Sequence, residues 1–165
     1  MILRSILDSP VLVRAVAAGW ALLPVHVRRF LMLRYPRPSF RVGVLAIVVS
    51  PDGGVLLLRH RFRSGKPWGL PGGWLEPGEG PVDGMRRELK EELDIDVAAD
   101  ALALVTAVSR GCRPHVEIFY RLHAVVDAVP PNAEFDEHAV FAVDALPSGM
   151  LELHRRIVEE QVDGN

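Results

Sequence analysis

Three glutamates lie at helical spacing in the middle of the chain: Glu88, Glu91 and Glu92. At about 100° per residue, positions i, i+3 and i+4 fall on one side of a helix. Carboxylates that close together repel one another. A bound hard cation reverses that repulsion, because magnesium and calcium take oxygen ligands. The spacing therefore indicates a divalent-cation site carried on a helix.

A helix is predicted around these glutamates. Pro81 suits a first helical position, and Asp83 is favourable in the first turn. The apolar residues of the segment recur at the spacing of one helix face, which would pack on a sheet. They are Val82, Met85, Leu89 and Leu93. Because the acidic arc borders this face, we expect the carboxylates to point along the core surface into a cleft.

The segment before the helix combines a short extended run with glycines and one more acidic residue. Residues 70–73 read Leu-Pro-Gly-Gly, and glycine permits both positive φ and a close approach of the backbone to a bound group. Glu79 follows in a loop framed by proline and glycine. Arg87 lies one turn before Glu91 and can orient that carboxylate. The predicted order is strand, glycine loop, acidic loop and acidic helix.

This stretch resembles the signature of the Nudix hydrolases, which reads G, five residues, E, seven residues, R-E-U-x-E-E-x-G-U, where U is aliphatic. The matching positions are Gly73, Glu79, Arg87, Glu88, Leu89, Glu91, Glu92 and Ile95. Asp94 replaces the penultimate glycine, where the backbone should turn left-handed as the helix ends. Aspartate is among the few residues that tolerate that conformation. A looser resemblance runs from about Phe40 to about Pro147.

The resemblance implies an α/β fold, a Nudix-type α/β/α sandwich with a mixed sheet. It implies hydrolysis of a nucleoside diphosphate linked to another moiety, with Mg²⁺, or Mn²⁺ as a second option. The implied metal-site residues are Glu88, Glu91, Glu92, Glu79 and Gly73. Arg87 would hold the carboxylates in place. The alternative function is a nucleotide-sensing module that binds without cleaving.

The proton acceptor and the substrate stay open at this point. Glu91 or Glu92 is favoured as the base, and Glu137 is a competitor because members of the family differ in where the base lies. Phosphate-binding candidates are Arg59, Arg61 and Arg110, in two basic segments. Neither the downstream proline of an ADP-ribose type nor the tyrosine of a dinucleoside polyphosphate type is at its expected place. ADP-ribose, nucleotide sugars and nucleoside triphosphates therefore all remain candidates.

Composition bounds the class of protein. A chain of 165 residues is long enough for one domain with a proper core. The single cysteine, Cys112, excludes an internal disulfide and a cysteine-rich metal site, so we expect a cytoplasmic protein. The net charge of −2 argues against stable nucleic-acid binding. The small nucleotide expected as partner is what the Nudix resemblance implies.

Residues 1–38 form an apolar and basic extension, separate from a catalytic domain over residues 39–165. Residues 1–41 contain seven arginines and one aspartate. The longest uncharged run, residues 15–25, is too short to span a bilayer. We expect one or two helices broken near Pro24, packed on the catalytic domain or on a second copy in a homodimer. The alternative is an interfacial helix on an anionic membrane.

Apolar runs bounded by turn residues predict the remaining elements. Strands are expected over residues 42–49, 55–59, 102–108, 116–123 and 140–143, and a helix over residues 150–162. Residues 129–134 are expected to form a loop.

Overall fold

A computed structural model describes residues 10–34, 40–109, 114–126, 129–130 and 133–162. The chain divides into two compact units, Met1–Pro38 and Ser39–Asn165. The strands, all in the second unit, are β1 (Arg41–Val49), β2 (Val55–His60), β3 (Trp68–Gly69), β4 (Gly72–Trp74), β5 (Ala103–Ser109), β6 (His115–His123) and β7 (Phe135–Phe141). The helices are α2 (Pro10–Leu22), α3 (Val25–Arg34), α4 (Pro81–Leu93) and α5 (Glu152–Val162), with short 3₁₀ turns η1 (Ala99–Ala101) and η2 (Val143–Ala145).

The strands form one mixed sheet in the order β3-β2-β1-β6-β5, with β4 pairing to β1 and β7 pairing to β2. β1 runs parallel to β6 along its whole length, and the other pairs are antiparallel. Seven consecutive residues of β1 are buried, from Gly43 onward. A strand covered on both faces reads as a continuous apolar run, which is why the sequence of β1 does not alternate.

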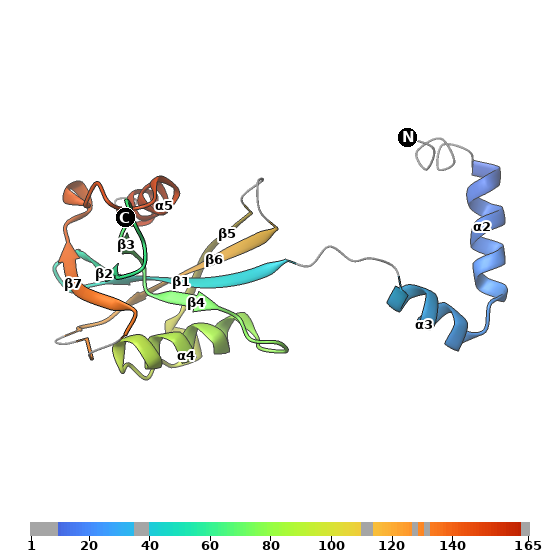
Figure 1. The fold of residues 1–165 in the computed structure, drawn as a ribbon, viewed down its shortest axis with the longest axis horizontal. Helices are drawn as coiled ribbons and strands as arrows, with labels where there is room; N and C mark the ends of the chain where they lie inside the picture. Colours follow the sequence, from blue (N-terminus) through green and yellow to red (C-terminus); the bar gives the residue numbers. More distant parts are fainter. Residues whose placement is uncertain (1–9, 35–39, 110–113, 127–128, 131–132, 163–165) are drawn as a thin grey trace. The chain divides into compact units, whose positions relative to one another are not determined.

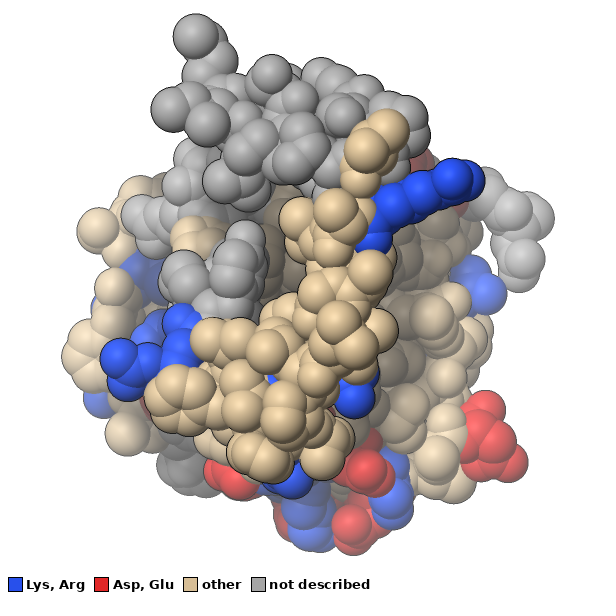
Figure 2. Space-filling model, turned by 90° about the vertical axis from the view of Figure 1, so that its right-hand side faces the viewer, with Lys and Arg blue, Asp and Glu red and all other residues tan. Residues whose placement is uncertain are grey.

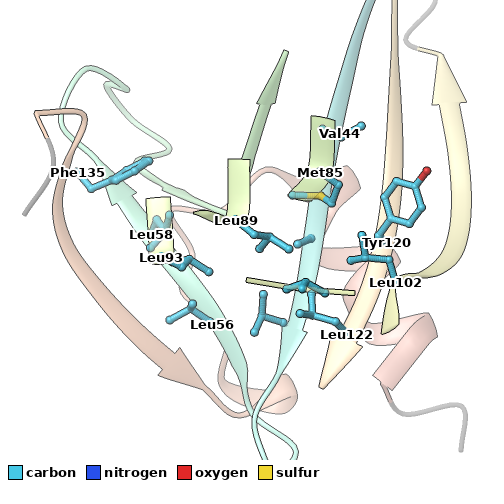
Figure 3. Packing of buried hydrophobic residues seen from close by; sticks show 13 residues of the cluster. Val44, Leu56, Leu58, Met85, Leu89, Leu93, Leu102, Tyr120, Leu122 and Phe135 are labelled. Atoms are coloured by element: carbon cyan, nitrogen blue, oxygen red, sulfur yellow. The ribbon is translucent and has the colours of Figure 1, made fainter. Parts of the chain in front are cut away.

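One helix covers each face of the sheet (Figure 1). Met85, Leu89 and Leu93 of α4 pack with every second residue of β1 from Val44 to Val48. Figure 3 shows these α4 side chains among those of the strands beneath them. The intervening β1 residues pack on the opposite face against Ile157 of α5. This is the predicted α/β/α sandwich with a mixed sheet.

The ends of α4 follow from its sequence. The helix begins at Pro81, where a missing N–H costs nothing, and its apolar stripe is the predicted one. It ends at Leu93, and Asp94 turns left-handed with φ 56° and ψ 32°. The N–H of Ile95 then donates to the carbonyl of Leu89 at 3.3 Å, as in a glycine-type helix terminus. The substitution at Asp94 therefore preserves the turn.

The last strand differs from the prediction. β7 begins at Phe135 and pairs with β2, whereas the sequence predicted a strand only from residue 140. Its first half carries Asp136, Glu137 and His138, and these side chains are exposed. An edge strand with one solvated face needs no apolar run, so its polar residues resemble a loop.

The N-terminal unit contains two helices, broken as expected near Pro24. The described parts of α2 and α3 are bent by 118° at that break. None of the described helices is by itself long and apolar enough to cross a membrane, although this bent pair passes the same test together. No residue of α3 is buried.

Candidate active site

The three glutamates of α4 have different surroundings. Glu88 and Glu92 are buried, and Glu91 is exposed. The backbone N–H of Gly72 donates to Glu92 Oε2 at 2.7 Å. A Cβ at Gly73 would collide with the carboxylate of Glu88. Gly72 is required for a different reason, because its φ is +134° and a Cβ there would collide with the backbone of β1. At Gly73 a side chain would displace the Glu88 carboxylate from its place against β4.

Arg87 joins the loop, the strand and the helix. Its Nε and Nη2 donate to the two carboxylate oxygens of Glu79 at 2.9 and 3.0 Å. Its Nη1 donates to Glu88 at 2.9 Å and to Glu91 at 3.3 Å. Nη2 also donates to the carbonyl of Trp74 at 3.0 Å. The predicted orienting role of Arg87 thus extends from Glu91 to Glu79 and Glu88.

Burial determines how readily these carboxylates ionise. It raises the pKa of Glu92 from 4.5 to about 8, although the Gly72 hydrogen bond opposes the shift. Burial also raises the pKa of Glu88, against the effect of Arg87. The hydrogen bond from Arg87 lowers the pKa of Glu79. Two neighbouring carboxylates that resist ionisation create a place where added positive charge is strongly favourable.

The donor chemistry fits a hard divalent cation, because Glu88, Glu91 and Glu92 supply carboxylate oxygens from one helix. In the described part of the chain, no three acidic, histidine or cysteine side chains converge as a ready-made metal cluster. Instead, the guanidinium of Arg87 draws Glu79 and Glu88 together. Ligation of a metal by Glu79, Glu88, Glu91, Glu92 and Gly73 stays a prediction.

Two of the predicted phosphate-binding arginines pair with acidic residues of β7. Arg61 Nε lies 2.6 Å from an oxygen of Asp136. Arg59 lies 3.7 Å from Asp136 and 4.0 Å from Glu137. Arg110 lies outside the described residues. The charges of Arg59 and Arg61 are therefore already balanced across the β2–β7 pair.

A pocket lies on the other side of β4, facing α5. Its wall includes the backbone of Gly72 and the side chains of Arg63, Glu117 and His154. His154 Nε2 lies 3.3 Å from Glu117 Oε2, and His115 Nε2 lies 3.7 Å from Glu117 Oε1. A larger hollow of about 570 Å³, lined by Phe40, Trp74 and Glu79 among others, lies beyond Trp74. Both hollows touch β4: the smaller one includes Gly72 and Gly73 in its wall, and the larger one includes Trp74.

Arg63 lies between the α4 carboxylates and this pocket. Desolvation by neighbouring atoms lowers its pKa, and the charges of Glu92, Glu117 and Glu134 oppose that shift. The guanidinium thus experiences carboxylates from α4, from β6 and from the segment before β7. Arg63 is therefore placed to meet an anionic group that enters this pocket.

The sequence alone did not single out Glu117 or His154. A signal for His154 exists, because it shares the helix face of Ile157 and Val158. The competitor base Glu137 is exposed on β7 beside Arg59. Glu134, by contrast, raises the pKa values of both Glu88 and Glu92 through its charge. The structure therefore brings Glu134 into electrostatic contact with the helix carboxylates.

Several known proteins are similar to this chain in sequence. The family model described as NUDIX domain matches residues 39–161. A MutT-like protein of Streptomyces ambofaciens is 45% identical over 65 residues, 39% of this chain and 41% of that protein. The 8-oxo-dGDP phosphatase NUDT18 of Mus musculus is 32% identical over 95 residues, 57% of this chain and 26% of that protein. The chain spans less than half the length of either curated relative that it matches.

A solved structure resembles most of the chain. The crystal structure of a MutT Nudix hydrolase from Burkholderia pseudomallei is 29% identical with a TM-score of 0.63. The match covers 74% of this chain and 98% of that one. The residues matched by the family model, 39–161, include the strands, α4 and nearly all of α5.

Proposed function

The chain belongs to the Nudix family of pyrophosphohydrolases, and we propose that it hydrolyses a phosphoanhydride bond in a nucleoside diphosphate derivative with a bound divalent cation. Mg²⁺ is the proposed cation, with Mn²⁺ as its substitute. The observation that carries the proposal is the pair of buried carboxylates, Glu88 and Glu92, held against the β4 glycines and supported by Arg87.

The reaction adds water to a phosphorus atom and releases two phosphate products. Glu88, Glu91 and Glu92 would hold the cation, which neutralises negative charge on the phosphate oxygens. Arg87 keeps Glu79 and Glu88 in fixed positions, so these oxygens need little rearrangement. Glu91 or Glu92 is the proposed proton acceptor, and Glu134, whose charge affects both buried glutamates, joins Glu137 as a competitor.

The pocket behind β4, with a volume of about 100 Å³, would take only a small part of the substrate. Arg63 would bind a phosphate oxygen, and Glu117 would accept hydrogen bonds from the attached group. The two histidines beside Glu117 hold its carboxylate in one orientation. Polar groups placed around a small pocket fix the orientation of a ligand more than its affinity.

A panel of substrates tests the proposal. It contains ADP-ribose, nucleotide sugars, nucleoside triphosphates and, because of the mouse relative's name, 8-oxo-dGDP. Each is incubated with full-length protein and Mg²⁺, Mn²⁺ or EDTA, and products are identified by ³¹P NMR. We expect cation-dependent release of two phosphate products from at least one compound. Tight nucleotide binding without product would contradict the proposal and favour the sensing alternative.

A further inference from the structure

The N-terminal unit presents apolar side chains that its own two helices do not cover. Of the 14 exposed large apolar side chains in the described residues, eight belong to this unit. They are Val11, Val16, Leu22, Val25, Phe30, Leu31, Met32 and Leu33. The remaining six are distributed over separate segments of the catalytic unit, from Phe40 to Val140. An exposed apolar surface concentrated in this way marks an interaction site.

The helix α2 is apolar around its circumference. At about 100° per residue, Val11 and Leu22 lie on one side, and Val16 and Trp20 lie on the other. Arg14 is its single charged residue. A helix that is apolar all round needs surroundings on every side, whereas a flat protein surface would cover only one side. Lipid acyl chains surround an inserted helix completely.

The charges carried by residues 10–34 of the unit all have one sign. Every charged side chain between residues 10 and 34 is an arginine: Arg14, Arg28, Arg29 and Arg34. Figure 2 shows blue arginine side chains among the tan atoms of the described residues on this side. Arginine stems can lie along acyl chains while the guanidinium reaches a phosphate headgroup. The charge complements an anionic bilayer surface.

The length of α2 favours insertion into a single leaflet of a bilayer. The 13 residues of α2 extend about 20 Å, which is shorter than the roughly 30 Å hydrocarbon core. At the break, the chain bends by 118° into α3, which carries three of the four arginines. We propose that residues 10–34 attach the protein to an anionic lipid bilayer, with α2 inserted into one leaflet and α3 lying in the headgroup region. This inference is independent of the proposed hydrolysis.

Co-sedimentation of the full chain with vesicles tests this attachment. The vesicles contain phosphatidylcholine alone or phosphatidylcholine with phosphatidylserine, at low and high salt. We expect binding to the anionic vesicles that weakens at high salt. Leu22→Glu should abolish it, whereas Leu104→Glu, at another exposed leucine on β5, should not. Arg29→Gln should weaken partitioning about fivefold, and Arg156→Gln on α5 should leave it unchanged.

Two further measurements distinguish attachment to a membrane from the two alternatives, in which a second copy of the chain or the catalytic unit covers these helices. Light scattering after gel filtration without lipid reports the oligomeric state, and thermal unfolding reports the stability of each variant. A protein that stays in the supernatant overturns the proposal. So does a lipid-free dimer that Leu22→Glu dissociates, because a second copy then covers the helices. A lipid-free monomer whose melting temperature falls with Leu22→Glu also overturns it, because the helices then pack on the catalytic unit.

Discussion

At the scale of single residues, Glu92 shows a conflict between stability and chemistry. Its carboxylate is buried, accepts one backbone hydrogen bond, and has a pKa raised to about 8. Without a cation, ionising this group in the folded protein is unfavourable. With a cation, the same buried charge becomes a strong ligand. Ionised Glu92 is therefore expected to stabilise the cation-bound protein and to destabilise the folded protein that lacks the cation.

A pH series on metal-free protein tests this conflict. The folded pKa of about 8 exceeds the ordinary 4.5, so the folded state holds the Glu92 proton more tightly. The free energy of unfolding should therefore fall as pH rises from about 4.5 to about 8, and this contribution should level off above that range. Glu92→Gln removes this contribution, and its amide oxygen can still accept from Gly72.

Urea unfolding in EDTA gives the measurement. We expect Glu92→Gln to exceed wild type in stability at pH 8 and to approach it at pH 5. Glu160→Gln, on the exposed side of α5, serves as the control and should follow wild type at both values. A wild-type protein at least as stable as Glu92→Gln at pH 8 would show that Glu92 ionises freely in the fold.

Arg87 is the second residue on which the site depends. Arg87→Lys keeps the charge but loses the planar pair of donors that holds both oxygens of Glu79. We expect kcat/KM to fall roughly 10- to 100-fold and more Mg²⁺ to be needed for half-maximal rate. Arg86→Lys, whose arginine donates to the Val97 carbonyl, should change neither value greatly. Equal kinetic constants for Arg87→Lys and Arg86→Lys would contradict a positioning role for Arg87.

At the scale of elements, the end of α4 accepts aspartate where the family motif has glycine. The left-handed Asp94 carries a steric cost that glycine lacks. Asp94 also pairs with Lys90 at 2.7 Å, an exposed contact of small value. We expect Asp94→Gly to raise stability by at most about 1 kcal/mol and Asp94→Val to lower it by about 1–2 kcal/mol. Urea midpoints measure both, and a destabilised Asp94→Gly would show that the ion pair outweighs the backbone cost.

Arg63, in the β2–β3 loop, and Arg59, on β2 beside β7, are expected to have different roles. Arg63→Ala should raise KM about 10- to 100-fold, the range for a lost charge-assisted hydrogen bond. Arg59→Ala should change KM less than about threefold, because Asp136 and Glu137 already neutralise Arg59. Steady-state kinetics on the substrate found in the panel compares the two. A larger increase in KM for Arg59→Ala than for Arg63→Ala would indicate that Arg59 is the residue that binds phosphate.

The elements also show how far sequence reasoning reaches. The helix from Pro81 to Leu93 and the left-handed Asp94 could be predicted, because spacing and termini are local properties. The start of β7 could not, since the polar residues from Asp136 to His138 are typical of loops. Their place in the sheet depends on pairing with β2, which is distant in sequence.

At the scale of the whole molecule, the sandwich brings together groups that the chain keeps far apart. The thin β4 strand separates the α4 carboxylates from the pocket that contains Glu117 and His154. The sequence predicted the first side of this strand because one continuous motif forms it. The second side combines residues from β6, α5 and a loop, so it could be recognised only once the sheet had placed them together.

The most direct test of the account compares two glutamine variants. Glu92→Gln and Glu160→Gln each remove one carboxylate charge, the first at the site and the second on α5. Turnover of the substrate found in the panel is measured at saturating Mg²⁺, with products followed by ³¹P NMR. We predict at least about a 100-fold loss for Glu92→Gln and the wild-type rate for Glu160→Gln. Wild-type turnover by Glu92→Gln, in a folded protein, would contradict the assignment of the catalytic site to α4.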